Sequence, residues 1–304
     1  MNRRDFLRSS CGALAAFESP PAARSRVVVA RGGAVAALLD RAVQAFYNRD
    51  NALEAWKLVA RPGEVIGLKV NCLAGRGTAS TSPALVEAIS ERLRQAGVGA
   101  KDIVVFDRLS EDLESAGFRI SDRPGRARTA GNDVFGYEED LAVYGSAGSL
   151  LSKAVTRVCD GIVNVPVLKD HSIAGVSIAL KNLFGAIHNP NKYHTNAGDP
   201  YIADVYMLPP IRKKVRLAIC DAMTAQYEGG PSYMPQWSWP MGALLVARDP
   251  VALDWTGWQI VDRKRAEVGL KPLASLDRRP SYIATAAGRG IGTNDPRRIE
   301  RVEV

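Results

Sequence analysis

Short apolar runs alternate with longer amphipathic segments along most of the chain. Six runs rich in Val, Ile and Leu have the length of buried strands, at residues 27–30, 65–72, 103–107, 161–165, 215–221 and 243–247. Helical patterns lie between them, at about residues 34–47, 83–95, 150–159, 175–187, 201–213 and 251–267. Strands that alternate with helices predict an α/β fold: a mostly parallel, doubly wound sheet with helices on both faces.

The length of the chain favours one folded unit. Its 304 residues are 46% hydrophobic and 24% charged, which is an ordinary globular composition. We expect a single α/β domain over residues 24–304, with an irregular insertion or lid around residues 108–148. No run approaches the roughly 20 consecutive apolar residues of a membrane-spanning helix, so the processed protein is not expected to span a membrane.

The first 23 residues read as a targeting segment. Arg3 and Arg4 are followed by Phe6 and Leu7 and then by a short apolar stretch at residues 11–17, a pattern that resembles a twin-arginine export signal. Residues 1–23 are therefore predicted to be a signal peptide that engages the twin-arginine export machinery. The protein is expected to be periplasmic or otherwise exported.

The basic charge of the chain suggests anionic partners, although a solvated basic surface also explains it. Its formal net charge is +8 at pH 7, but the Lys and Arg residues are spread along the sequence. No block resembles a nucleic-acid arm, and the common nucleic-acid-binding motifs are missing. Nucleic acid is therefore not an expected partner.

Cysteine usage limits the cofactors that this chain could hold. Cys72, Cys159 and Cys220 follow the predicted signal, and no two of them form a C-x-x-C pair. An iron–sulfur cluster or structural zinc is not expected, and the three thiols are interpreted as buried strand residues. Export in the folded state is often used for proteins that carry a cofactor. The cofactor is left open, with a transition metal as one candidate.

Polar residues gather where the predicted strands end. Lys69 and Asn71 close the second strand, and Asp221 closes a later one. Pro166 interrupts the strand that precedes Lys169, because proline cannot donate to a central ladder. The carboxyl ends of parallel strands lie on one side of a sheet, so these side chains are expected to share a cleft.

The histidines of the chain are clustered. His171, His188 and His194 lie within 24 residues, and histidine is suited both to proton transfer near neutral pH and to metal binding. If a helix over residues 175–187 continues through Gly185, it presents Lys181 and His188 on one face. The cluster is therefore a candidate catalytic centre.

Five ordered segments resemble one known family. They are Gly67 to Asn71, Asn164 to His171, Ala179 to Gly185, Gly229 to Pro231 and Asp249 to Asp254. Together they are similar to the domain-of-unknown-function family numbered 362. The resemblance extends over nearly all of the chain that follows the predicted signal and implies a fold but no reaction. Many members carry an additional ferredoxin-like segment, whose cysteines this chain lacks.

Two classes of function remain open. In the first, the protein is an enzyme that acts on a small carboxylate or phosphate by acid–base or metal-assisted chemistry. Its predicted catalytic residues are His171, Lys181 and His188, and its predicted substrate-binding residues are Lys69, Asn71, Lys169 and Asn182. The predicted metal ligands are His188, His194 and Asp221, with Asp254 as an alternative carboxylate. In the second class, the protein only binds an anionic ligand or cofactor and performs no chemistry.

Overall fold

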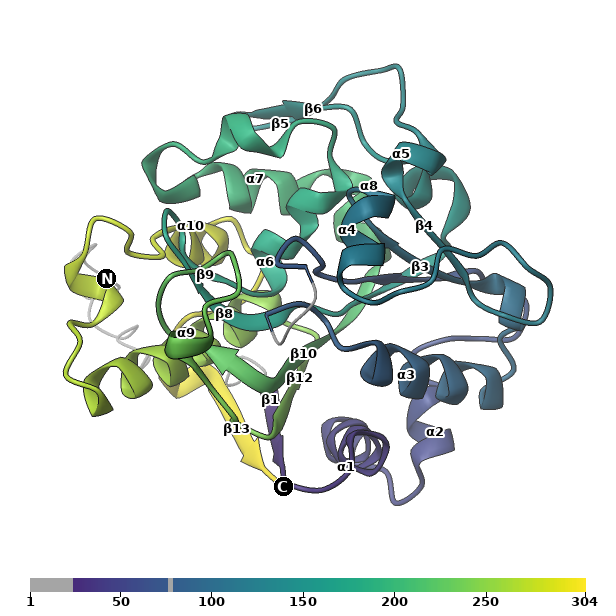
Figure 1. The fold of residues 1–304 in the computed structure, drawn as a ribbon, viewed down its shortest axis with the longest axis horizontal. Helices are drawn as coiled ribbons and strands as arrows, with labels where there is room; N and C mark the ends of the chain where they lie inside the picture. The colour runs from purple at the N-terminus through teal and green to yellow at the C-terminus, as the bar shows by residue number, and fades with distance from the viewer. Residues whose placement is uncertain (1–23, 76–78) are drawn as a thin grey trace, which may run out of the picture.

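One large sheet organises the protein. The computed structural model describes residues 24–75 and 79–304, so the predicted export signal at residues 1–23 lies outside the described residues. Eight strands follow one another across the sheet in the described part (Figure 1): β13 (Ile299–Glu303), β1 (Ser25–Arg31), β12 (Ala243–Ala247), β10 (Val215–Gln226), β7 (Gly161–Asn164), β2 (Ile66–Lys69), β3 (Ile103–Asp107) and β4 (Arg128–Gly131). Only β12 runs against its neighbours in this order, which confirms the prediction of a mostly parallel sheet.

The sheet is extended beside the end of β10. After Pro166, β8 (Val167–His171) pairs in parallel with the distal half of β10, and β9 (Gly175–Ser177) folds back on β8. The short β11 (Ser238–Trp239) also pairs with β10. Pro166 thus breaks β7 from β8, because its nitrogen has no hydrogen to donate.

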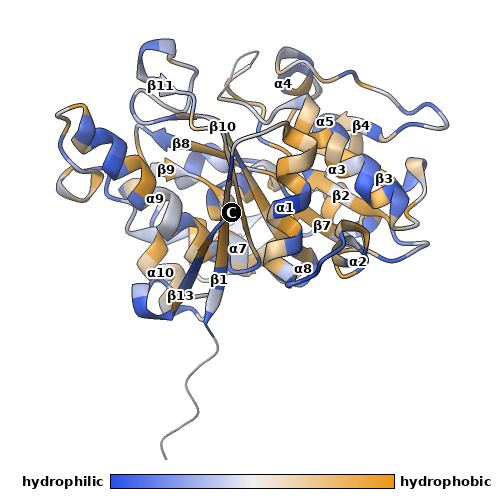
Figure 2. Cartoon of the chain, turned by 90° about the horizontal axis from the view of Figure 1, so that it is seen from below, coloured by the Kyte–Doolittle hydropathy of each residue, from blue (hydrophilic) through white to orange (hydrophobic). Residues whose placement is uncertain are grey.

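Helices cover both faces of the sheet. Along β1, Val27 and Val29 belong to one hydrophobic core, and Val28 and Ala30 to the other, as the alternation of side chains along a strand requires. One core includes residues of α1 (Val35–Tyr47), α2 (Ala52–Trp56) and α3 (Pro83–Gln95). The other includes residues of α6 (Ala179–Asn182), α7 (Tyr201–Met207), α8 (Pro209–Lys214), α9 (Pro250–Glu267) and α10 (Tyr282–Gly288). Figure 2 shows α1 and α3 on one side of the strands and α9 and α10 on the other.

Strong patterns in the sequence predicted their elements well. All six expected strands are present, as β1, β2, β3, β7, β10 and β12, and the helices expected at residues 34–47, 83–95 and 251–267 are α1, α3 and α9. The three cysteines of the described residues are buried, as the sequence predicted. None of the helices in the described residues is long and apolar enough to cross a membrane.

The expected helix over residues 175–187 is wrong. Residues Gly175–Ser177 form β9, and the α-helical part is limited to α6 before a 3-10 turn at Leu183–Ala186. Ile187 is extended, with φ −118° and ψ 154°. The helical face that was expected to carry both Lys181 and His188 therefore does not exist.

Two other expected helices are shorter or divided. The helix predicted at residues 150–159 is a π-helical segment at Ala154–Val158. The helix predicted at residues 201–213 is split into α7 and α8, because Pro209 cannot continue α7.

The segment at residues 108–148 is more ordered than the sequence suggested. It contains α4 (Ser110–Ser115), β4 and α5 (Asn132–Phe135), and β4 pairs in parallel with β3 as part of the main sheet. Beyond α5, β5 (Ala142–Tyr144) forms a hairpin with β6 (Ala147–Ser149).

Candidate functional site

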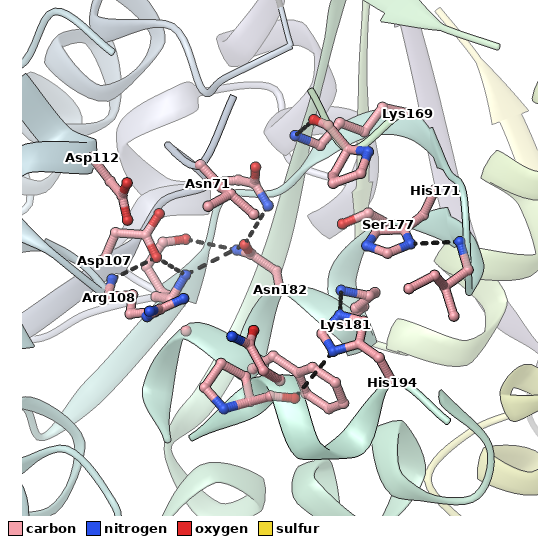
Figure 3. A pocket seen from close by; sticks show the side chains of 18 of the residues that line it. Asn71, Asp107, Arg108, Asp112, Lys169, His171, Ser177, Lys181, Asn182 and His194 are labelled. Carbon is pink, nitrogen blue, oxygen red and sulfur yellow. Dashed lines mark hydrogen bonds and ion pairs between the residues drawn. The ribbon is translucent and has the colours of Figure 1, made fainter. Parts of the chain in front are cut away.

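A pocket of about 380 Å³ opens at the carboxyl ends of the central strands. Seven residues predicted from the sequence line it: Lys69, Asn71, Lys169, His171, Lys181, Asn182 and His194. Figure 3 shows six of these side chains around one space: Asn71, Lys169, His171, Lys181, Asn182 and His194. The strand-end residues Lys69, Asn71 and Lys169 therefore share one cleft, as expected.

A buried ion pair forms one wall of the pocket. Lys69 at the end of β2 donates from Nζ to Asp107 Oδ1 at 2.8 Å, and Asp107 closes the neighbouring strand β3. The other carboxylate oxygen of Asp107 accepts from the backbone N–H of Cys72 at 2.7 Å. Lys69 is only 1% exposed, so its charge is offset inside the protein by Asp107.

Three asparagines connect this ion pair to α6. Asn182 Nδ2 donates to Asn164 Oδ1 at 2.7 Å and to the carbonyl of Lys69 at 3.2 Å. Its Oδ1 accepts from Asn71 Nδ2 at 3.1 Å. Lys69 and Asn164 are register partners on adjacent parallel strands, which places both within reach of Asn182. Asn71 and Asn182 are therefore parts of a connected network as well as lining residues.

Gly185 allows the chain to approach the ion pair closely. A Cβ added at Gly185 would lie 2.6 Å from Asp107 Oδ1 and 2.7 Å from Lys69 Nζ. These distances are shorter than van der Waals contact, so a side chain at this position would displace the pair. A steric requirement thus explains why the segment at residues 179–185 ends in glycine.

Lys169 places a second ammonium group in the pocket. It is 1% exposed, and its Nζ donates to the carbonyls of Ala79 at 2.7 Å and Pro231 at 3.1 Å. Burial lowers the pKa of Lys169 to about 8, although the nearby Asp107 acts in the opposite direction. Two backbone carbonyls hold the group in place, and its third hydrogen has no partner among residues 24–75 and 79–304.

Lys181 contributes a third ammonium group, beside a histidine. Its Nζ lies 3.1 Å from His194 Nε2, and His194 Nδ1 lies 3.1 Å from the carbonyl of Pro190. The carbonyl can only accept, so His194 is protonated on Nδ1 and offers Nε2 as an acceptor to Lys181. Burial and the charge of Lys169 lower the pKa of Lys181 to about 7. Burial and Lys181 also lower the pKa of His194.

His171 is held in the opposite orientation. Its Nδ1 accepts from the backbone N–H groups of Ile173 at 3.1 Å and Ala174 at 3.2 Å, which leaves Nε2 as the protonated nitrogen. Its ring stacks on that of His194, with centroids 5.5 Å apart. Burial, Lys181 and His194 lower the pKa of His171 to about 2, so the ring is neutral near physiological pH.

A distant carboxyl group positions α6. Asp254 of α9 accepts from the backbone N–H groups of Ala179 at 2.7 Å and Leu180 at 3.2 Å. Tyr282 donates to the same carboxyl group at 3.4 Å. Asp254 is fully buried, and burial raises its pKa to about 8. It therefore fixes the start of the helix that carries Lys181 and Asn182 and does not line the pocket.

His188 and Asp221 are placed elsewhere. His188 is exposed and packs edge-on against Tyr137, with ring centroids 5.0 Å apart. Asp221 accepts from the backbone N–H groups of Ser82 and Met223, so it stabilises the start of α3. The predicted set of metal ligands is not assembled, and the described residues contain no group of three His, Cys, Asp or Glu side chains arranged to hold a metal ion.

Sequence reasoning missed Arg108 and Asp112, which also line the pocket. Both belong to the segment that looked irregular. Their position after β3 could have identified them, because the loop that follows the carboxyl end of a parallel strand borders this edge of the sheet. Burial raises the pKa of Asp112.

The charges of the pocket are unequal. Asp107 pairs with Lys69, whereas neither Lys169 nor Lys181 forms an ion pair with a carboxylate within residues 24–75 and 79–304. Two buried ammonium groups therefore face one cavity with only carbonyl or imidazole acceptors. The two ammonium groups repel each other, and a bound anion would relieve this repulsion, so the site favours an anionic ligand.

The sequence can be compared with known proteins. Residues 66–259 match the family described as Domain of unknown function (DUF362), and this range includes every candidate residue of the pocket. A similar curated protein is the "Thylakoid-associated protein sll1697" of Synechocystis sp., which is 24% identical over 257 residues. The aligned part covers 79% of this chain and 75% of the relative. Since the family match extends over more than half of the sequence, the chain belongs to the family Domain of unknown function (DUF362).

Proposed function

We propose that the pocket is the active site of an enzyme that acts on a small molecule bearing a carboxylate or phosphate. The observation that carries this proposal is the pair of buried ammonium groups, Lys169 and Lys181, which line one cavity without a carboxylate partner among the described residues. An anionic ligand would offset both charges. Lysine is a compact cation that binds carboxylates and phosphates as a point charge.

Acid–base chemistry suits the groups around this charge. His194 Nε2 is an acceptor 3.1 Å from the amino group of Lys181. Because the pKa of Lys181 is lowered to about 7, its ammonium and amine forms are both populated near neutral pH. His171 presents a neutral imidazole with its proton on Nε2. The acid–base form of the hypothesis is therefore preferred to the metal-assisted form, because no group of three His, Cys, Asp or Glu side chains among the described residues is arranged to hold a metal ion.

We also propose that the protein acts outside the cytoplasm. The support is the Arg3-Arg4 pattern near the N-terminus, which resembles a twin-arginine signal. The name of the thylakoid-associated relative is compatible with export.

Ligand-dependent stabilisation tests the proposal. Thermal unfolding of the purified protein should shift upward with inorganic phosphate or small carboxylates, because a ligand that binds only the folded state stabilises it. Lys169→Met and Lys181→Met should each reduce the shift. Lys213→Met, which changes an exposed lysine of α8, should leave it unchanged. An equal anion effect in all four proteins would refute the anionic site. Stabilisation without turnover of any substrate would favour the binding protein over the enzyme.

A further inference from the structure

The three pocket lysines differ in how their amino groups are held. Lys69 is bound by a carboxylate and by the carbonyl of Val70, and Lys169 by two carbonyls. Lys181 Nζ has one hydrogen-bond partner within the described residues, the imidazole of His194. It also lies over the ring of Phe184, 5.1 Å from the centroid.

This difference decides which lysine can act as an amine. The carbonyl oxygens that hold Lys169 cannot take a proton from an ammonium near neutral pH, and a carboxylate, such as the one beside Lys69, is a weaker base than an imidazole. An imidazole nitrogen can also take up the proton itself. Lys181 is therefore the lysine of this pocket whose neighbour can convert the ammonium into a nucleophilic amine.

We propose that Lys181 forms an imine with the carbonyl group of an anionic substrate, a 2-oxo acid or a carbonyl compound bearing phosphate. This inference rests on the proposed anionic site and names the class of compound that it would process. Lys169, fixed by two backbone carbonyls, would hold the anionic group while the carbonyl carbon faces Lys181. Lysines activated by burial or by a second cation commonly carry out this type of covalent catalysis.

The step balances with the groups present. His194 Nε2 takes one proton from the Lys181 ammonium, and the amine attacks the carbonyl carbon to form a C–N bond. The carbonyl oxygen takes a second proton from the attacking nitrogen to become a hydroxyl group, then receives the proton held by His194 and leaves as water. The nitrogen lone pair closes the C=N bond, so ammonium and carbonyl give a protonated imine and one water. No oxidant or reductant is consumed.

The neighbouring residues favour this reaction over hydrolysis. Lys181 is 8% exposed, and the ring of Phe184 covers one side of its amino group. Limited access of water slows the reverse reaction. The protonated imine carries one positive charge, as the ammonium of Lys181 does. Its formation therefore does not change the repulsion between this position and Lys169.

Reductive trapping tests the inference. The full-length protein is incubated with pyruvate or dihydroxyacetone phosphate and sodium cyanoborohydride, digested, and mapped by mass spectrometry. We expect the reduced adduct on Lys181 in the unaltered protein, with weaker labelling by acetone, which lacks an anionic group. Pyruvate and dihydroxyacetone phosphate distinguish a carboxylate from a phosphate as the anionic part. Adducts distributed over exposed lysines such as Lys213, or absent from Lys181 with all three compounds, would overturn the inference.

A matched variant separates this inference from the proposed function. Lys181→Arg retains a cation but cannot form an imine, so it should still be stabilised by phosphate while losing the adduct. Unaltered protein that is stabilised by phosphate yet forms no adduct would refute the imine and leave the anionic site. Protein that shows neither effect would refute both. An adduct that persists in Lys181→Arg would place the reactive amine elsewhere.

Discussion

The amino group of Lys181 lies 3.1 Å from Nε2 of His194, and the carbonyl of Pro190 fixes the tautomer that makes this nitrogen an acceptor. The relationship joins a residue of α6 to one that directly follows the 3-10 turn at Pro190–Tyr193, 13 positions later. It gives a buried lysine a partner that can either accept a hydrogen bond or take a proton. The expected pH dependence of the protein follows from this arrangement.

The contribution of Lys181 to the stability of the unliganded protein should rise with pH above about 7. Lys181 has a pKa of about 7 in the folded protein, against an ordinary value of 10.5. Between these values the unfolded chain binds a proton at this residue that the folded protein lacks, so raising the pH favours folding. One lysine contributes at most about 1.4 kcal/mol per pH unit.

Urea unfolding from pH 6.5 to 9.5 measures this effect. The unaltered protein should gain stability relative to Lys181→Met as the pH rises. Lys213→Met serves as the control, and its curve should run parallel to that of the unaltered protein. A constant difference between the unaltered protein and Lys181→Met would show that the pKa of Lys181 is not lowered.

Replacing His171 by asparagine should destabilise the protein less than replacing it by alanine. His171→Ala leaves the N–H groups of Ile173 and Ala174 without their acceptor, at a cost of about 1–3 kcal/mol for a buried group. The side-chain oxygen of asparagine can accept in place of Nδ1. The free energy of unfolding, measured by chemical denaturation, should therefore be higher for His171→Asn than for His171→Ala. Equal losses in the two variants would mean that the Nδ1 hydrogen bonds do not stabilise this turn.

Gly185→Ala should lower the stability of the protein, although it adds only one methyl group. The added methyl group would lie 2.6 Å from Asp107 Oδ1 and would force apart a buried ion pair. Overpacking of a close-packed interior typically costs about 1–3 kcal/mol. Gly288→Ala is the matched control, because a Cβ there meets nothing within 4 Å. The unfolding free energies of both variants test the prediction, which fails if Gly185→Ala is as stable as the control.

The sequence predicted the sheet because strand signals in it are local. Continuous Val, Ile and Leu runs mark β1, β3 and β12, and parallel strands bring their carboxyl ends to one edge. That rule was sufficient to place Lys69 and Lys169 in one pocket. The same rule wrongly placed Asp221 there, because β10 continues past this residue to Gln226.

The segment after β8 could not be predicted from local pattern. The apolar residues from Val176 to Ile187 are buried by surrounding elements on several sides, so their spacing does not identify a helix face. The start of α6 depends on Asp254, 75 positions from Ala179. Gly185, in the 3-10 turn that follows α6, lies close to the Lys69–Asp107 pair. His188 was therefore assigned to the site by its distance along the sequence, whereas the extended Ile187 directs it to the surface.

The N-terminal arginines should control export. Replacing Arg3 and Arg4 together by lysine preserves the charge but removes the pair that the twin-arginine machinery reads. We expect the variant to remain in the cytoplasm when cell fractions are compared by immunoblotting. Unchanged export would contradict the twin-arginine interpretation.

The central claim is that Lys169 and Lys181 form a binding site for a small anion. Calorimetric titration of the purified protein with inorganic phosphate, near pH 6.5 and again near pH 9, tests it most directly. The account predicts saturable binding that weakens at the higher pH, as Lys181 and then Lys169 lose their charges, and that is lost in the Lys169→Met/Lys181→Met double variant. Equal binding by the unaltered protein and the folded double variant, or no binding at either pH, would contradict it.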